Sequence, residues 1–250
     1  MQRDSRFAQA VELTTATYDR IAENYAQRNE NMGRHWLERM ETFVDMLADF
    51  ESAHPIPEVG RPADDVTLED YLQLVPVLDA GCGHGRDARN LAANGQHVLA
   101  IDLSQGMLDV AAERTARKLP RGSIHYALMD MRHLELPDAC CRGVWCSAAL
   151  LHIPMHRAPL AVNELVRVAR RGAPFVFFLK QRRDGQDPEQ IVPYGNGDQP
   201  DLPRFYAYYT LDEARALFED AGLTVIDSAT VADRHMHDAP GWISYIAQKP

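Results

Sequence analysis

The stretch VLDAGCGHGRDARNL, from Val77 to Leu91, decides how this chain folds. Its first residues form an apolar run typical of a buried strand, and its last residues show the spacing typical of a helix. Gly81, Gly83 and Gly85 lie between these parts at every second position. In open α/β sheets the ligand lies beyond the carboxyl ends of the strands, where glycine lets the backbone approach it closely. The stretch therefore predicts an α/β fold with a ligand at this turn.

Strands and helices alternate along the rest of the chain. Apolar runs predict strands at 75–80, 97–101, 123–128, 143–148, 173–180, 223–231 and 242–248. Helical spacing and capping residues predict helices at 7–26, 34–50, 86–95, 104–118, 157–170 and 210–221, with a short one after Thr67. This alternation implies right-handed crossovers and a doubly wound parallel sheet with helices on both faces. Glycines and prolines between 182 and 204 predict a long loop, which is either a lid or mobile.

Acidic residues near the glycine turn narrow the choice of ligand. The dinucleotide fingerprint GxGxxG requires a third glycine where this chain has Arg86. Asp79 would repel a pyrophosphate at the helix N-terminus, but it would attract a ligand that carries an ammonium and a sulfonium. Asp102 ends the second strand and can accept hydrogen bonds from both ribose hydroxyls, and Asp130 follows the third strand and can accept one from an adenine amino group. S-adenosylmethionine has all of these groups.

These motifs resemble the class I S-adenosylmethionine-dependent methyltransferases, in particular the small-molecule branch. The resemblance covers about residues 75–225 and rests on VLDAGCGHGRDARNLA, VLAIDLSQGMLDVA, ALMDMRHLEL, GVWCSAALLHIP, ELVRVARRGAPFVFF and RFYAYYTLDEARALFEDAGL. The N-terminal YDRIAENYAQR also resembles the segment that caps the cofactor in such enzymes. The family implies a Rossmann-like, mainly parallel sheet of seven strands with an antiparallel last strand, together with N-terminal helices.

The resemblance also implies which residues hold the cofactor. Asp79 and the turn glycines would cradle the methionine portion, Asp102 the ribose and Asp130 with Met131 the adenine, and Ser147 would lie near the sulfur. The complete set of cofactor-binding candidates is Asp79, Gly81, Cys82, Gly83, Gly85, Asp102, Leu103, Met107, Asp130, Met131, Ser147, Tyr25 and Arg34. Within it, Arg34 is a candidate for the methionine carboxylate and Tyr25 for its lid.

The chemistry of methyl transfer indicates which residues to expect around the methyl acceptor. The reaction is an in-line displacement of a good leaving group, so alignment and exclusion of water matter most and no fixed catalytic residue is required. Where the nucleophile carries a proton, an imidazole can accept it. His152, in SAALLHIP after the fourth strand, is the candidate for this role, with packing or substrate contact as the alternative. The substrate-binding candidates are Tyr18, His152, Lys180, Arg204 and Tyr206.

Composition limits the partners and the location. The chain has 36 acidic and 26 basic residues, a formal charge of -10 and no long basic run, which argues against nucleic acid as the main partner. It has no charged leader and no run of about 18 apolar residues, so we expect no membrane span and a cytoplasmic location. His152 and His156 have the spacing of a zinc pair on a helix, but Pro154 lies between them and no HExxH acid is present. No third ligand follows His235 and His237, so no metal is expected. The cysteines lack disulfide or metal spacing and are expected to be reduced thiols: Cys82, Cys140, Cys141 and Cys146.

The length of 250 residues suits one large domain with additions. We predict an N-terminal helical cap at 1–50, an insertion or linker at 51–74 and the methyltransferase core at 75–250. The leading interpretation is a methyltransferase for a small-molecule acceptor. The alternatives are an RNA (tRNA) methyltransferase, because the GCGHGR loop also resembles tRNA-modifying relatives, and a non-catalytic S-adenosylmethionine-binding regulatory partner. A nicotinamide dehydrogenase is disfavoured by Arg86 and Asp79.

Overall fold

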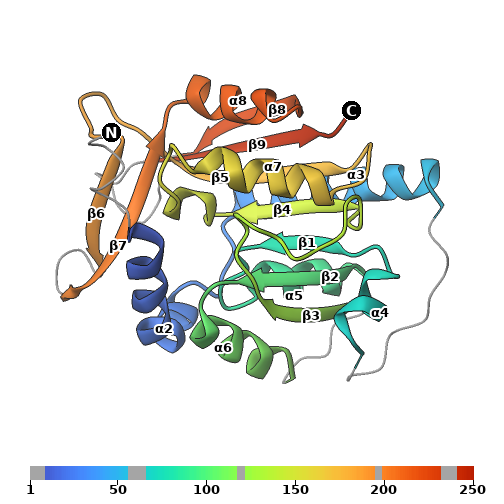
Figure 1. Cartoon of the computed structure of the whole chain (residues 1–250), viewed down its shortest axis with the longest axis horizontal. Coiled ribbons are helices and arrows are strands. Elements are labelled where there is room, and N and C mark those ends of the chain that lie inside the picture. Colours follow the sequence, from blue (N-terminus) through green and yellow to red (C-terminus); the bar gives the residue numbers. More distant parts are fainter. Residues whose placement is uncertain (1–8, 56–65, 117–121, 195–198, 232–240) are drawn as a thin grey trace.

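A mainly parallel sheet crosses the centre of the molecule and carries helices on both faces (Figure 1). The structure, a computed structural model, describes residues 9–55, 66–116, 122–194, 199–231 and 241–250. Seven strands follow one another across the sheet in the order β3-β2-β1-β4-β5-β9-β8, with β9 antiparallel to both of its neighbours. They are β1 (Val77–Ala80), β2 (His97–Asp102), β3 (Ser123–Leu128), β4 (Gly143–Ser147), β5 (Pro174–Gln181), β8 (Thr224–Val231) and β9 (Trp242–Gln248). The predicted strands, fold class and antiparallel last strand are confirmed.

Apolar helix faces cover both sides of this sheet. On one side lie α3 (Arg34–Ala53), α5 (Arg86–Ala93) and α6 (Gln105–Ala116), and α3 buries Phe43 and Leu47 against Trp145 of β4. On the other side lie α4 (Leu68–Leu72), α7 (Ala158–Val168) and α8 (Leu211–Asp220), where Leu165 and Phe218 are fully buried. Because strands buried on both faces are mainly apolar, β1 and β4 carry few polar residues, and the exceptions are Asp79 in β1 and Ser147 at the end of β4.

The helix starts follow the capping residues seen in the sequence. The side chain of Thr67 accepts a hydrogen bond from the backbone of Asp70 at the start of α4, and Thr210 forms a capping box with Glu213 at the start of α8. The Ser104 hydroxyl accepts from the Met107 amide, which confirms the predicted cap of α6. The predicted beginning of the first helix, at Phe7, and the predicted end of α6, near 118, lie outside the described residues.

The helix α2 (Ala10–Arg28) lies across the carboxyl ends of the parallel strands, as Figure 1 shows. On one side Asp19 of α2 accepts hydrogen bonds from the Ser104 hydroxyl, at 2.6 Å, and from the Gly106 amide, at 3.0 Å. On the other side the Thr14 hydroxyl accepts from the Phe205 amide, at 2.9 Å. Within the predicted cap at 1–50, α2 thus roofs the strand ends, whereas α3 packs on the sheet face.

The prediction of a long loop at 182–204 is wrong over much of this range, because two strands lie there. The strands β6 (Glu189–Tyr194) and β7 (Gln199–Tyr209) form an antiparallel hairpin. Because β7 also pairs in parallel with the end of β5, the hairpin extends the sheet to nine strands. Pro193 lies opposite Pro203, and the register shifts after Pro193. Because proline has no N–H to donate, it is confined to edge strands and bulges, and prolines in such strands are easily mistaken for a loop. Figure 1 places this hairpin beside α2.

Candidate functional site

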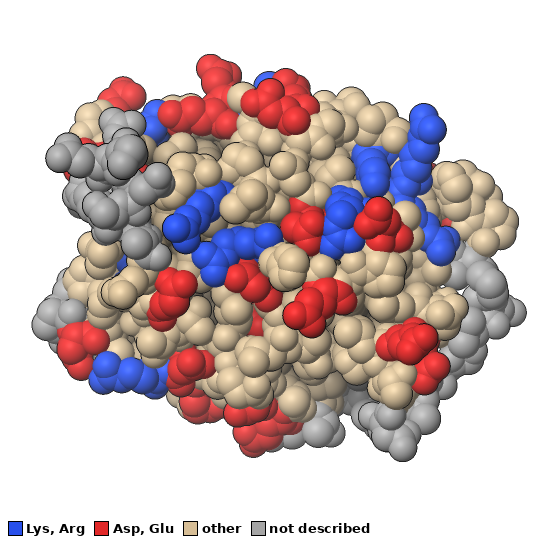
Figure 2. All heavy atoms as spheres, viewed as in Figure 1, with Lys and Arg blue, Asp and Glu red and all other residues tan. Residues whose placement is uncertain are grey.

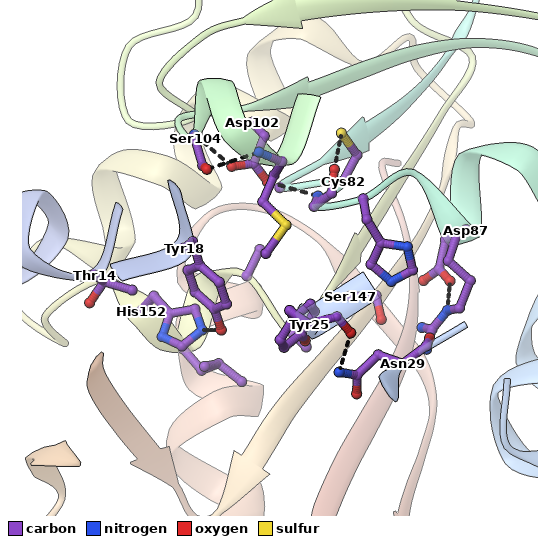
Figure 3. A pocket seen from close by; sticks show the side chains of 18 of the residues that line it. Thr14, Tyr18, Tyr25, Asn29, Cys82, Asp87, Asp102, Ser104, Ser147 and His152 are labelled. Carbon is purple, nitrogen blue, oxygen red and sulfur yellow. Dashed lines mark hydrogen bonds and ion pairs between the residues drawn. The ribbon is translucent and has the colours of Figure 1, made fainter. Parts of the chain in front are cut away.

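A cavity of about 670 Å³ opens at the carboxyl ends of the parallel strands, below α2 and beside the β6–β7 hairpin. Figure 3 shows side chains from α2, the glycine turn and η1 (Leu150–His152) that converge on it. All five acceptor candidates line the cavity, and so do all of the cofactor candidates except Gly85. The sequence prediction therefore chose residues that the fold brings together.

The three turn glycines all have positive φ, at 73°, 52° and 74°, but for different reasons. A Cβ on Gly81 would lie 2.2 Å from the Ala149 Cβ, so this glycine permits close packing of two loops. A Cβ on Gly85 would lie 2.5 Å from the Tyr126 hydroxyl, so this glycine is needed below the turn and not on the cavity wall. A Cβ on Gly83 would meet nothing within 4 Å, which leaves its backbone open to a ligand.

Asp102 is fastened to the glycine turn. One carboxylate oxygen accepts from the Gly83 amide at 2.8 Å, and the other accepts from the Ser104 amide at 2.9 Å (Figure 3). Burial raises the pKa of Asp102, and the hydrogen bonds from Ser104 and Gly83 act in the opposite direction. The carboxylate is thus held in place with further lone pairs available to hydroxyl groups in the cavity.

Asp79 is a buried carboxylate with one oxygen that lacks a partner. Its side chain is 1% exposed, and its Oδ2 accepts no hydrogen bond among the described residues. Neighbouring Asp87 is satisfied, because it accepts from Arg86 at 2.6 Å and from the Trp145 indole at 2.8 Å. Burial, followed by the charge of Asp87, raises the pKa of Asp79 well above its usual range. An unpaired buried acid that lines a cavity is suited to a cationic ligand.

Asp130 lies on the wall formed by the end of β3. Both of its oxygens accept from the Arg132 guanidinium, at 2.7 to 3.0 Å. Burial raises the pKa of Asp130, but the hydrogen bonds from Arg132 outweigh it and the net shift is downward. An adenine amino group would therefore share this carboxylate with Arg132. Met131 and Leu103 lie on the same wall and are partly buried, and Met107 is buried.

Ser147 lies at the end of β4, where it meets an aromatic group. The Trp36 indole donates to its hydroxyl at 3.0 Å and stacks on Phe178, with 4.3 Å between the ring centroids. The Lys180 ammonium lies 3.9 Å from the centroid of the Trp242 ring. Trp36 of α3, Lys180 of β5 and Trp242 of β9 all line the cavity together with Ser147.

Two of the cofactor-binding candidates, Tyr25 of α2 and Arg34 of α3, differ in how far their side chains are exposed. Tyr25 belongs to α2, and the centroid of its ring lies 5.3 Å from that of Tyr18 and 6.0 Å from that of His84, edge-on to both. Burial raises the pKa of Tyr25. Arg34 lines the cavity, but its side chain is 80% exposed and forms an ion pair with Glu38 at 2.8 Å. Tyr25 is therefore a buried part of the cavity wall, whereas Arg34 lies at the rim.

Three of the acceptor candidates, Tyr18, Arg204 and Tyr206, gather around His152. Its Nε2 lies 2.8 Å from the Tyr18 hydroxyl and its Nδ1 lies 2.6 Å from the Phe205 carbonyl oxygen, as Figure 3 shows for Tyr18. The Tyr206 ring is edge-on to the imidazole at 4.9 Å, and Arg204 donates to the Tyr18 oxygen at 3.4 Å. Burial is the main cause that lowers the pKa of His152 to about 3, with the Arg204 charge acting in the same direction.

Several cavity residues escaped the sequence prediction. Trp36 belongs to an amphipathic helix that was interpreted as core, and Tyr194 lies in the segment that was interpreted as a loop. His84 also lines the cavity, and burial is the main cause that lowers its pKa to about 4. Its position inside GCGHGR was the only available signal.

The described residues offer neither a metal-binding group of side chains nor a helix suited to span a membrane. They contain no group of three or more His, Cys, Asp or Glu side chains that could hold a metal ion. His235 and His237 lie outside that part of the chain. Among the same residues, no helix combines the length and the apolar character that a membrane span requires.

Comparison with known proteins gives the class of this chain. Residues 77–172 match the family described as "Methyltransferase domain". The chain is 35% identical over 198 residues to a malonyl-[acyl-carrier protein] O-methyltransferase from Pectobacterium atrosepticum, covering 70% of this chain and 74% of that protein. It is 26% identical over 216 residues to the O-methyltransferase cnsE from Penicillium expansum, covering 81% of this chain and 75% of that protein.

The fold is shared with solved structures as well. Magnesium protoporphyrin IX methyltransferase from Synechocystis PCC 6803, solved with bound S-adenosylmethionine, aligns with a TM-score of 0.60 at 16% identity, over 95% of this chain and 97% of that one. The chain belongs to the class I S-adenosylmethionine-dependent methyltransferase family. It is an enzyme of this family with S-adenosylmethionine as its cofactor.

Proposed function

We propose that this enzyme transfers the methyl group of S-adenosylmethionine, in line, to a small-molecule acceptor that binds in the same cavity. The cofactor supplies an electrophilic methyl group on a sulfonium that leaves as a neutral thioether. The protein's own contribution is to hold, align and shield the reactants, because such a displacement gains most from orientation and from exclusion of water.

The observation that carries this proposal is the unpaired oxygen of Asp79. A buried carboxylate without a partner is costly unless a ligand compensates it. A cationic ammonium or sulfonium fits this requirement, whereas a pyrophosphate beside Asp79 and Asp87 does not. The open backbone at Gly83 and the anchored carboxylate of Asp102 support the placement of the methionine portion and the ribose. Asp130, with Met131 and Met107, is the proposed adenine wall.

The acceptor side is proposed to lie between Tyr18, His152, Arg204 and Tyr206, and Lys180 and Trp242 line the same cavity. Tyr25 and α2 would shield the reacting groups from water, since α2 lies over the strand ends. The cavity of about 670 Å³ is in the range of small-molecule sites.

The surface supports a small molecule more than an RNA. On the face shown in Figure 2, acidic side chains lie between the basic ones, and they leave no continuous basic stripe there. The formal charge of -10 is likewise unfavourable for a polyanion. The relatives named above include O-methyltransferases, which supports an oxygen nucleophile for this enzyme.

Ligand-dependent unfolding tests the cofactor assignment directly. We expect S-adenosylmethionine and its demethylated product to raise the melting temperature at millimolar concentration, because a ligand that binds only the native state stabilises it by mass action. NAD is the matched control, since it shares the adenosine but carries a pyrophosphate. Equal protection by NAD, or no protection by either adenosyl ligand, would contradict the proposal.

A further inference from the structure

Arg204 lies in a cage of aromatic rings at the acceptor end of the cavity. It belongs to β7, and its guanidinium carbon lies 5.0 Å from the ring centroid of Tyr194, 5.1 Å from that of Tyr206 and 5.8 Å from that of Tyr18. We call these three rings with Arg204 the tyrosine cage. The rings stabilise a cation through their π faces, but they accept few of the five N–H bonds that a guanidinium offers.

The charge of Arg204 has no acidic partner among the described residues. Its only side-chain hydrogen bond there is the one to the Tyr18 oxygen, at 3.4 Å, and its Nε is buried without a partner. Other arginines of the cavity differ: Arg86 is paired with Asp87 at 2.6 Å and Arg132 with Asp130 at 2.7 Å. A partly buried guanidinium with unused donors on a cavity wall is suited to an anionic ligand, and carboxylates match its planar fork.

The hydrogen bonds around His152 run in one direction. A carbonyl oxygen can only accept, so the proton on the imidazole lies on Nδ1 and is donated to Phe205. Nε2 is then an acceptor, and the Tyr18 hydroxyl donates to it. The Tyr18 oxygen in turn accepts from Arg204. Both ring nitrogens of His152 and the Tyr18 proton are thus engaged within the protein.

This arrangement has a consequence for the acceptor. A proton taken up by His152 would break its hydrogen bond from Tyr18 and place a second cation beside Arg204. The site is therefore suited to a nucleophile that arrives without a proton. A carboxylic acid is ionised at neutral pH, whereas alcohols, amines and most phenols are protonated.

We propose that the methyl acceptor is a small carboxylic acid, bound through its carboxylate to Arg204 in the tyrosine cage and methylated on that carboxylate. The inference rests on the proposed function. A carboxylate oxygen donates an electron pair to the methyl carbon, the O–CH₃ bond forms, and the C–S bond breaks with its electron pair left on sulfur. The negative carboxylate and the positive sulfonium become a neutral ester and a neutral thioether, so no proton is released. The ester no longer pairs with Arg204, which favours release of the product.

A panel of matched acceptors tests the substrate class. The enzyme is incubated with methyl-labelled S-adenosylmethionine and with benzoate, phenylacetate or octanoate, and in parallel with the amide and the alcohol of each skeleton. Methyl esters release labelled methanol in alkali, whereas ethers and N-methyl groups do not. We expect alkali-labile label from at least one acid, at a rate roughly 50-fold or more above its amide and alcohol, since the neutral analogues cannot form the ion pair. Alkali-stable label, or equal rates with neutral analogues, would overturn the proposal.

Variants connect the activity to Arg204. Arg204→Met is expected to lower kcat/KM for the best acid by about 100-fold, mainly through KM, while Arg204→Lys keeps the charge and recovers part of the loss. Arg20→Met is the matched control, because Arg20 also joins α2 to the hairpin but is exposed and paired with Asp201. The pH profile of kcat/KM should be flat from about pH 6 to 9, since no base is titrated. An Arg204→Met enzyme within about threefold of the wild type would contradict the assignment.

Failure of this inference is distinguishable from failure of the proposed function. Binding of the demethylated cofactor to the wild type is measured first, by calorimetry. If it does not bind, the proposed function fails. If it binds, but no acid of the panel is methylated or stabilises the binary complex against heat more than its amide does, the carboxylate inference alone fails.

Discussion

The two ends of the cavity are built from opposite chemistry. At the cofactor end, Asp79 and Asp102 project from the ends of neighbouring strands, and the glycine turn supplies bare backbone. At the acceptor end, the tyrosine cage combines side chains from α2 and from the hairpin around one cation. The acidic end matches a cationic donor and the basic end an anionic acceptor. In the proposed function, these opposite charges would set the direction in which the two reactants bind.

Removal of the Asp79 charge is the most direct test of the cofactor end, because it is expected to weaken cofactor binding. We expect Asp79→Asn to weaken binding of S-adenosylmethionine by roughly 10- to 100-fold, because a charge-assisted contact is worth about 1.5 to 3 kcal/mol. Calorimetric titration measures this loss. The unliganded variant should be at least as stable as the wild type, since burial disfavours the ionised acid.

Asp138→Asn is the matched control, because Asp138 is 78% exposed and lies outside the cavity lining. It should bind the cofactor as the wild type does. Unchanged affinity in the Asp79 variant would place the cationic group of the cofactor elsewhere.

The acceptor end makes stability depend on pH through His152. Its folded pKa of about 3 lies below the unfolded value, so the native state binds fewer protons than the unfolded chain in acid. The stability that it contributes is complete above about pH 6.5 and is lost as the pH falls toward the folded pKa. At pH 5 the loss is about 2 kcal/mol, and we expect urea titrations of the wild type to show it.

His152→Gln should remove this share of the loss between pH 7 and 5, whereas replacement of the exposed His133 should not. His84 remains in both variants and keeps its own contribution, because its pKa is lowered in the same direction, to about 4. The same slope in the wild type and in His152→Gln would show that the imidazole is not buried as described.

Alanine substitutions at two glycines distinguish the effect of backbone strain from the loss of a ligand contact. They are expected to have the smallest effect of the changes described. Gly83 and Gly95 both have positive φ, and a Cβ on either would meet nothing within 4 Å. Each alanine variant should therefore lose about 1 kcal/mol of stability from the left-handed backbone. Only Gly83 lines the cavity, so Gly83→Ala should also weaken the cofactor by about 10-fold while Gly95→Ala leaves its affinity unchanged. Equal affinities would mean that the cofactor does not approach Gly83.

The difference between the two ends also explains which residues were predictable. Asp79, Gly83 and Asp102 follow strands directly, and parallel strands end at one edge of the sheet, so their proximity follows from order along the chain. Trp36 and Tyr194 reach the cavity only because α3 and β6 pack where they do, and each has a sequence context typical of another role. The hairpin was missed because its prolines are typical of loops.

The sequence by itself determined the alternating α/β order, the glycine turn and the acids that select an adenosyl cation, because these depend on local period and on positions at strand ends. Only the tertiary structure decided that Tyr18, His152 and Arg204 meet, since Tyr18 lies 134 residues from His152 and 186 residues from Arg204 along the chain. It also decided that Oδ2 of Asp79 and Nε of Arg204 are left without hydrogen-bond partners among the described residues. Whether a polar group lacks a partner depends on every neighbour that packing places around it, and a linear pattern does not contain that information.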